Sequence, residues 1–301
     1  MFDIAPPLQQ TQVYADAVRL LGARADRLDL PGGRALILRR QWPLLGEVAM
    51  ISRGPVWTHD ATPVTTCAGL RRRIGAHHLI IHADRMDQAA HLLAAGFRRL
   101  HQGPTVADLS LSGGPRDWAA RMQGKWRNRL RHALSHPLRV QRATLPPDPR
   151  HWIFRADAAV ARRRGYRPMP PAMIAALAAV RPGAVQILTA FDRDHPVAAM
   201  VFLRCGPIAV YQIGWSDTQG RAMSAGNLLM WQAMLALHQM GVDRIELGLA
   251  DAATAPGLAR FKTGTGAALR QTGGTWIDTA LLPRRVRRGA LGQEACGMVV
   301  A

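Results

Sequence analysis

Apolar runs alternate with amphipathic stretches along the second half of the chain, and each run has the length of one structural element. The stretch 224–240 is apolar around most of its circumference, which predicts a central, buried helix ending at Gly241. Runs rich in β-branched and aromatic residues predict strands at 184–191, 196–203, 208–215 and 244–249, followed by a strand pair broken at 272–274. Lys262 follows the fourth strand in a glycine-flanked segment. We therefore expect it in a loop beyond the carboxyl end of a sheet, where open α/β sheets bind ligands.

The first half shows the same alternation of strands and helices. A helix is predicted at 11–22, with Thr11 as its N-cap and Gly22 as its stop. Further strands are predicted at 34–40, 47–52, 78–83 and 105–111, and further helices at 64–75 and 87–95. The Gly- and Pro-rich segment 112–116 indicates a linker. We expect two mixed α/β domains, 1–112 and 113–283, and a basic, disordered tail at 284–301.

A basic amphipathic helix is predicted directly after the linker, over 117–135. Its apolar residues fall on one narrow face and comprise Ala119, Met122, Trp126, Leu130 and Ala133. Basic side chains, Lys125, Arg127 and Arg129 among them, cover the remainder. Two interpretations stay open: an ordinary solvated helix, or a helix whose basic side lines the path of an anion.

Charge sets this chain apart from an average globular protein. Its 301 residues carry a formal net charge of +19, which favours polyanionic partners such as a nucleotide, RNA or an anionic lipid surface. Only two of its 39 basic Lys and Arg residues are lysines, Lys125 and Lys262. Drift from lysine to arginine explains much of this bias. A site that needs a compact, titratable ammonium would resist that exchange, so both lysines are candidate functional residues.

Several classes of site are not supported by the sequence. The three cysteines are far apart, and the eleven histidines lack metal-ligand spacing, so we expect neither a disulfide framework nor a metal. Phosphate-loop, dinucleotide-binding, zinc-protease and serine-hydrolase motifs are absent. No signal peptide and no run of about 20 apolar residues is found, which indicates a cytoplasmic protein or one peripheral to the inner face of a membrane.

The start of the long helix is a candidate phosphate site. Ser224 can cap the helix while Asn227 reaches back, as in a capping box. Gly226 keeps the first turn bare, so backbone N–H groups are accessible to an anion. The alternative is an ordinary, well-capped helix.

These motifs together resemble a known family. The segments Ser224-Ala-Gly-Asn-Leu-Leu-Met-Trp231, Glu246-Leu-Gly248 and Gly257-Leu-Ala-Arg-Phe-Lys262-Thr-Gly264 are similar to the C-terminal half of FemABX-like peptidyltransferases and to the related BioF2-like acetyltransferase domain of the GNAT superfamily. Lys125-Trp-Arg-Asn-Arg129 and Arg53-Gly-Pro-Val56 resemble further motifs of that family. The resemblance covers most of 30–280. It implies two tandem GNAT-like domains, each a mostly antiparallel twisted sheet flanked by helices.

The resemblance implies transfer of an acyl or aminoacyl group from a CoA thioester or an aminoacyl-tRNA to a small-molecule or peptide amine. It places Lys262 near the reaction or the donor phosphate. The other candidate donor contacts are Lys125, Arg127, Arg129, Ser224, Gly226, Asn227 and Arg260. GNAT enzymes that bind acetyl-CoA usually have an Arg- or Gln-led, glycine-containing motif at the start of the central helix. Segment 221–226 contains these residue types at a different spacing, so acyl-CoA and aminoacyl-tRNA both stay open as donors.

Three further residues are candidates from their positions. Asp251 follows the strand 244–249 and is a candidate base, or a cap of the next turn. Tyr211 and Trp215 would wall an acyl pocket, or pack in the core. A different class of function is a non-catalytic basic module that binds RNA or an anionic membrane surface, without a role for Lys262. No DNA partner is expected.

Overall fold

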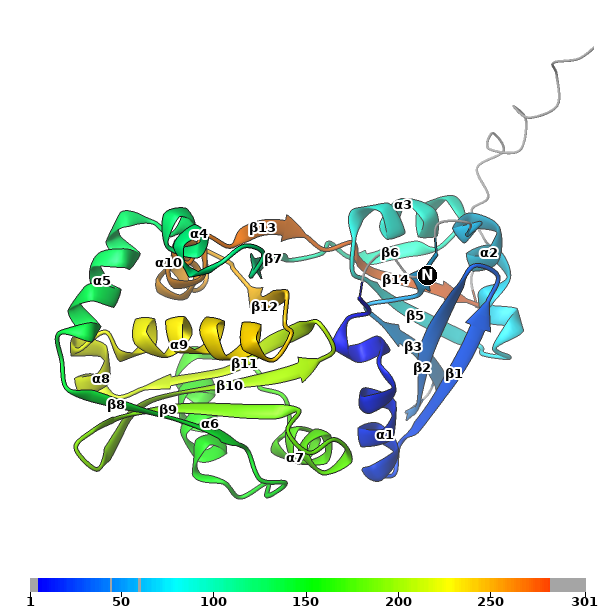
Figure 1. Ribbon diagram of the computed structural model, residues 1–301. Helices are drawn as coiled ribbons and strands as arrows, with labels where there is room; N and C mark the ends of the chain where they lie inside the picture. Colours follow the sequence, from blue (N-terminus) through cyan, green and yellow to red (C-terminus); the bar gives the residue numbers. More distant parts are fainter. Residues whose placement is uncertain (1–4, 44, 59–60, 282–301) are drawn as a thin grey trace, which may run out of the picture. The chain divides into compact units, whose positions relative to one another are not determined.

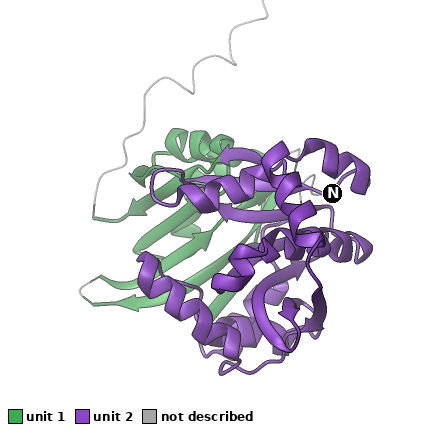
Figure 2. Ribbon diagram, turned by 90° about the vertical axis from the view of Figure 1, so that its left-hand side faces the viewer, with its two compact units in different colours: residues 1–4, 23–103, 271–301 green, residues 5–22, 104–270 purple. Residues whose placement is uncertain are grey.

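The computed structural model describes residues 5–43, 45–58 and 61–281. Within these ranges the chain forms two compact units, coloured separately in Figure 2. The first unit contains residues 23–103 and the stretch from 271 onward, and the second contains residues 5–22 and 104–270. The basic tail expected at 284–301 lies outside the described residues.

The first unit is built on a seven-stranded sheet with the order β1-β2-β3-β5-β14-β6, and β4 pairs with β2. Its elements are β1 (Arg24–Leu30), β2 (Gly33–Trp42), β3 (Gly46–Ser52), β4 (Val56–Trp57), α2 (Pro63–Arg73), β5 (His78–Ala83), α3 (Met86–Ala94), β6 (Arg98–His101) and β14 (Gly274–Thr279). The strands β3 and β5 run parallel, and the other pairs are antiparallel. One core joins the sheet to α2 and α3.

The second unit has a seven-stranded sheet with the order β13-β7-β12-β11-β10-β9-β8. Its strands are β7 (Thr105–Ser110), β8 (Leu138–Thr144), β9 (Val185–Asp192), β10 (His195–Cys205), β11 (Ile208–Ser216), β12 (Arg244–Leu249) and β13 (Ala268–Gln271). Its helices are η1 (Leu8–Gln10), α1 (Gln12–Leu20), α4 (Pro115–Arg121), α5 (Gly124–Leu134), α6 (Trp152–Arg164), α7 (Pro171–Val180), α8 (Thr218–Ala222), α9 (Ala225–Gln239) and α10 (Pro256–Gly264). The strands β11 and β12 run parallel.

The long apolar helix is central in the second unit, as the sequence predicts. Figure 1 shows α9 across one face of the sheet, with α6 and α7 on the other face. Leu229, Met230, Ala233 and Met234 of α9 are fully buried in a core that also contains Trp118 and Trp126. Burial of such side chains contributes about 1.5–3 kcal/mol each, so α9 anchors this unit.

The expected fold class is confirmed, since both sheets are mostly antiparallel and flanked by helices. Thr11 caps α1 as predicted, because its hydroxyl accepts the backbone N–H of Tyr14 at 3.3 Å. The described residues contain no helix long and apolar enough to cross a membrane.

Three local predictions need correction. The helix expected at 117–135 is two helices, α4 and α5, because Met122 and Gln123 are extended and Gln123 donates its N–H to the carbonyl of Gly264. Lys262 lies in α10 instead of a loop. The strand at 105–111, β7, pairs with β12 in the second unit. The division of the chain into folding domains at 112 and 283 stays a prediction.

Candidate active site

Two adjacent strands of the second unit separate halfway along their length. The parallel pairing of β11 with β12 covers only Ile208–Val210 and Arg244–Glu246, although β11 continues to Ser216 and β12 to Leu249. Each strand has a register shift on its other side at this point, between Val201 and Phe202 of β10 and between Glu246 and Gly248 of β12. Because bulges increase the local twist, they turn the two strands apart. Beyond these three residue pairs, β11 and β12 do not pair with each other, which leaves an opening in their pairing.

Lys262 lies at the end of this opening. Its Nζ donates to the carbonyl oxygen of Leu249, the last residue of β12, at 2.6 Å, and lies 5.9 Å from the ring centroid of Tyr211. The residue is only 5% exposed, and burial lowers the pKa of the ammonium from 10.5 to about 8. An ammonium has three donors. A single hydrogen bond is therefore not enough to satisfy it, and it can serve a ligand.

The helix that carries Lys262 is fixed by close packing against α5. The indole Nε1 of Trp126 donates to the carbonyl of Phe261 at 3.1 Å, and the two rings lie 6.2 Å apart. Gly264 permits this approach, since a Cβ at that position would lie 2.6 Å from Cδ1 of Trp126. The apolar face of α5 predicted from the sequence is thus the surface that holds α10.

Tyr211 forms the second wall of the opening. Its ring packs 5.6 Å from that of Phe202, and its hydroxyl lies over Gly214, where no side chain would fit. Burial, with the nearby Tyr166 and Asp157, raises the pKa of the Tyr211 phenol, which outweighs the opposing effect of Arg164. Tyr211 is therefore a neutral donor at physiological pH.

A buried acid faces the same region and was not singled out by the sequence analysis. Asp157 of α6 is 7% exposed and accepts a hydrogen bond from the hydroxyl of Tyr166 at 2.7 Å. Burial raises the pKa of the Asp157 carboxyl. Asp157 lies three residues after Phe154 and four before Ala161, both buried, so it occupies the apolar stripe of its helix. An acidic residue within the apolar stripe of a predicted helix is the sequence signal that could have identified Asp157.

An aromatic pair adjoins these residues. Trp152 at the start of α6 and Trp215 of β11 make an edge-to-face contact with ring centroids 5.4 Å apart. Both are partly buried. Trp215 was expected to wall a pocket or to pack in the core. The structure places it beside α6, on the same strand as Tyr211.

The N-terminus of α9 is open, but its capping differs from the prediction. Ser224 adopts a left-handed conformation, and its side chain makes no capping hydrogen bond, so the expected capping box is wrong. Asn227 is buried, and within the described part of the chain its Nδ2 has no hydrogen-bond partner. A Cβ on Gly226 would meet only Met200 and Phe261, at 3.7 and 4.0 Å. The start of α9 therefore lies beside Phe261, which precedes Lys262 in the sequence. It offers donors that have no partner among the described residues, such as the Asn227 amide.

The exposed basic candidates lie apart from Lys262. Lys125, Arg127 and Arg129 are exposed on α5, and Arg260 is exposed on α10. None of them makes a contact with Lys262 within the described residues. The structure thus brings together Lys262 and Tyr211 from the predicted set, and gathers the other cations on the surface.

Asp251 is held by its own turn. Its carboxylate accepts the backbone N–H of Ala253 at 2.8 Å and the hydroxyl of Thr254 at 2.7 Å. These hydrogen bonds lower the pKa of Asp251. A carboxylate stabilised in its charged form is a weaker base, so this geometry favours the capping role.

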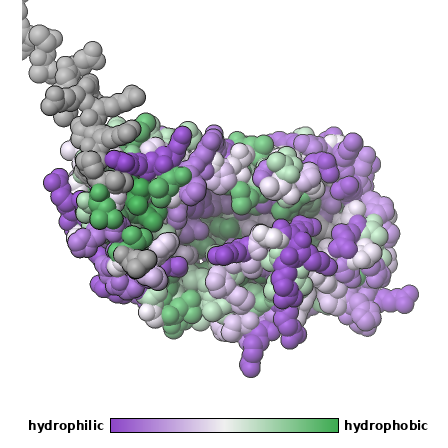
Figure 3. Space-filling model, turned by 180° about the vertical axis from the view of Figure 1, so that it is seen from behind, coloured by the Kyte–Doolittle hydropathy of each residue, from purple (hydrophilic) through white to green (hydrophobic). Residues whose placement is uncertain are grey.

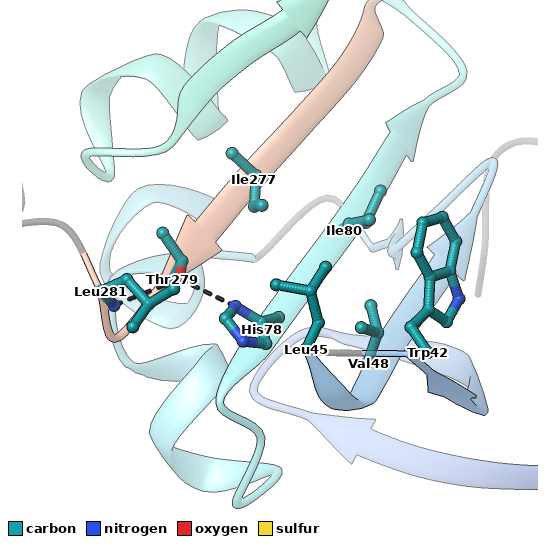
Figure 4. Close-up of a pocket in the computed structure, with 8 residues that line it drawn as sticks. All are labelled: Trp42, Leu45, Val48, His78, Ile80, Ile277, Thr279 and Leu281. Carbon is teal, nitrogen blue, oxygen red and sulfur yellow. Dashed lines mark hydrogen bonds between the residues drawn. The ribbon is translucent and has the colours of Figure 1, made fainter.

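A separate apolar cavity of about 340 Å³ lies in the first unit (Figure 4). It is lined by Trp42, Leu45, Val48, His78, Ile80, Ile277, Thr279 and Leu281. Green side chains gather on this unit in Figure 3. The Thr279 hydroxyl bonds to both Nδ1 of His78 and the Leu281 N–H. This cavity is lined mostly by apolar side chains, and its described lining residues form no cluster of reactive groups. Among the described residues, no group of three or more His, Cys, Asp or Glu could hold a metal ion.

The fold is a mixed α/β fold with two mostly antiparallel sheets, and a family model matches part of it. Residues 120–263, which contain the diverging strands and Lys262, match the family model described as "Acetyltransferase (GNAT) domain". The resemblance to the GNAT superfamily found in the sequence is therefore confirmed for this part of the chain. No curated protein sequence matches the chain.

Solved structures agree on the fold over nearly the whole chain. FemX superposes with a TM-score of 0.74 at 15% identity, covering 90% of this chain and 92% of its own. The C-terminal domain of a putative lysylphosphatidylglycerol synthetase from Agrobacterium fabrum gives 0.56 at 15% identity, with coverages of 90% and 88%. A tandem GNAT protein from the clavulanic acid biosynthesis pathway gives 0.51 at 13% identity, with coverages of 92% and 90%.

Proposed function

We propose that this protein is an N-acyltransferase that moves an acyl or aminoacyl group from a thioester or ester donor to an amine, with Lys262 at the reaction centre. The observation that carries the proposal is the buried ammonium of Lys262, held between the end of β12 and the ring of Tyr211. A buried charge without a carboxylate partner is unfavourable for folding. Such a group is retained most readily where it performs chemistry.

The donor site is proposed along the opening between β11 and β12. The strand edges that β11 and β12 turn toward each other beyond their short pairing can bind an extended chain, and the open start of α9 with the Asn227 amide can bind its phosphates. These features fit a CoA-like or tRNA-like donor. When bound, the donor supplies an activated acyl carbonyl.

Lys262 is proposed to stabilise the charge that develops on the carbonyl oxygen. As the N–C bond to the amine forms, the carbonyl electrons move to oxygen, where Nζ–H donors of Lys262 oppose their charge. The C–S or C–O bond to the donor then breaks, and the leaving group takes up the proton that the amine loses. Fixed donors of this kind contribute about 2.7–4 kcal/mol to lowering a barrier. Tyr211 stays neutral and forms one wall of the site.

An aminoacyl-tRNA donor is supported by one specific observation. Between Asp117 and Asp148 the chain has seven Arg and Lys residues and no acid, and this stretch forms the exposed sides of α5 and β8. A surface of a single sign attracts a polyanion. Lys125, Arg127 and Arg129 would then contact its phosphates.

Thermal shift with acetyl-CoA, a longer acyl-CoA, free CoA and bulk tRNA tests the proposal at two salt concentrations. A ligand at a hundred times its Kd stabilises the native state by about 2.7 kcal/mol. Stabilisation by a CoA thioester that persists at the higher salt, exceeds the stabilisation by free CoA, and falls to the free-CoA level in Lys262→Met supports acyl-CoA. Stabilisation by tRNA alone, falling steeply with salt, supports an aminoacyl donor.

The control variant is Arg24→Met. It removes an exposed cation from the first unit, with a side chain 69% exposed, and should leave each response intact. A wild-type protein that responds to none of these ligands would contradict the proposed acyl transfer, and would favour a non-catalytic basic module that binds an anionic membrane surface.

A further inference from the structure

Asp157 differs from most acids of this protein in having no cationic partner. Arginine pairs with buried or half-buried acids elsewhere, at Asp26, Glu47, Asp84, Asp108 and Asp278. Asp157 accepts one hydrogen bond, from Tyr166, and no Arg, Lys or His of the described residues forms an ion pair with it. The other two buried acids of the described residues, Glu246 and Asp278, each form an ion pair with an arginine.

Burial of such a carboxylate is unfavourable unless a positive charge compensates it. The side chain cannot reach solvent freely, since Asp157 is 7% exposed among Phe154, Ala161 and the other buried residues of α6. Its raised pKa has the same cause. A cation from outside the protein would relieve this penalty.

Access to the carboxylate is provided by Tyr166. This residue follows Gly165, which ends α6 in a left-handed conformation, and Tyr166 is 42% exposed while its hydroxyl reaches Asp157. Burial and the adjacent Asp157 raise the pKa of Tyr166, against the effect of Arg164, so the phenol stays protonated. It donates to the carboxylate and leaves its oxygen lone pairs for an N–H donor.

The pair lies next to the reaction centre of the proposed function. The hydroxyl of Tyr211 is within electrostatic range of Tyr166 and Asp157, and the ring of Tyr211 lies 5.9 Å from Lys262. Trp152, five residues before Asp157 on α6, contacts Trp215 of β11. The cation site and the lysine therefore both lie near Tyr211, with aromatic rings beside them that favour a cation.

We propose that Asp157 and Tyr166 bind the ammonium group of the acceptor, which is therefore an aliphatic primary amine carried as a cation. This inference rests on the proposed acyl transfer. Asp157 accepts one N–H of the ammonium and Tyr166 accepts another, which orients the nitrogen toward the carbonyl that Lys262 polarises. Asp157 is then the residue positioned to take up the proton that the ammonium must lose before it can attack.

The test uses n-butylammonium chloride as the probe, with n-butanol and tetramethylammonium as controls at matched ionic strength. The full chain is labelled with ¹³C at aspartate carboxyl carbons, and the Asp157 signal is identified as the one missing from Asp157→Asn. Butylammonium should shift that signal saturably, and neither control should. Tyr166→Phe should weaken the binding about tenfold, the effect of losing one hydrogen bond to a charged group.

Thermal melting separates this role from a structural one. If Asp157 is kept for a ligand, Asp157→Asn should melt at the wild-type temperature or above it, because the neutral amide keeps the shape and loses the buried charge. A lower melting temperature together with an unchanged butylammonium response in Tyr166→Phe would mean that the pair only fixes the end of α6. That outcome overturns the inference, as does a wild-type Asp157 signal that ignores butylammonium.

Failure of this inference can be told apart from failure of the proposed function. Lys262→Met should lose the extra stabilisation that the acyl group of the donor adds and keep the butylammonium response. Asp157→Asn should keep that stabilisation by the acyl donor. A protein that binds butylammonium through Asp157 but no donor would overturn acyl transfer alone.

Discussion

The hydroxyl of Tyr211 lies directly over Gly214, three residues further along β11, at a distance that excludes any side chain on the glycine. The strand bulges between these two residues, at the point where its pairing with β10 shifts. Gly214 does not have a positive φ, so a glycine is required here to make room for the Tyr211 hydroxyl and not to permit an unusual backbone conformation. Absence of one methyl group therefore determines where the phenol points.

Gly214→Ala should displace Tyr211 and weaken donor binding more than it lowers stability. Overpacking of this kind destabilises a protein by about 1–3 kcal/mol. Donor-dependent thermal shift and urea unfolding measure the two effects. Gly69→Ala is the control, because its Cβ would meet nothing within 4 Å and alanine favours its helix α2. Equal donor responses in both variants would remove Tyr211 from the site.

Gly264→Ala should loosen the contact between α10 and α5. Its Cβ would lie 2.6 Å from Cδ1 of Trp126, and we expect the free energy of unfolding to fall by about 1–3 kcal/mol. Gly257→Ala, in the same helix, meets nothing within 4 Å and should stabilise by up to about 1 kcal/mol. Urea denaturation of the two variants gives the comparison. Similar stabilities would mean that Trp126 moves aside easily.

The titration of Lys262 should appear in the pH dependence of stability. Its pKa is about 8 in the fold and 10.5 when unperturbed, so between these values the unfolded chain holds a proton that the native state has released. The free energy of unfolding of the wild type, relative to Lys262→Met, should therefore rise from pH 8 to pH 10.5. This rise in the free energy of unfolding amounts to about 1.4 kcal/mol for each unit by which the pKa of Lys262 is lowered in the fold. If the free energy of unfolding depended on pH in the same way in both proteins, the pKa of Lys262 would not be lowered by the fold.

Replacing Lys125, Arg127 and Arg129 of α5 by glutamine should reduce the salt dependence of tRNA binding. Each lost phosphate contact lowers the slope of log K against log salt by about 0.7–0.9. All three side chains are exposed, so the fold should be unaffected. Filter binding over a salt series measures the slope. An unchanged slope would place the polyanion on another surface.

Much of this fold follows from local patterns. The apolar face of Trp126 and Leu130 predicts which side of α5 is buried, and Thr11 caps its helix as a threonine at that position should. Both depend only on neighbours in the sequence. The break between α4 and α5 was missed because it depends on a hydrogen bond from Gln123 to Gly264, 141 positions away.

The candidate site was predicted in part for the same reason. Lys262 and Tyr211 could be selected by residue type and by the strands that precede them, and they lie 5.9 Å apart in the structure. The acid at Asp157 was missed, since its significance comes from a tyrosine beyond the end of its helix and from burial against the sheet. Divergence of β11 and β12 depends on bulges that periodicity does not reveal.

By its position, the last described strand, β14, affects how the first unit can fold during synthesis of the chain. It lies between β5 and β6, so Trp276 completes a sheet whose other strands end at His101. During synthesis, residues 23–103 leave the ribosome long before their missing strand does. The first unit must then wait, with an open sheet edge, while the second unit is translated. A nascent chain stopped before residue 274 would be a substrate for chaperones, and not a folded half-protein.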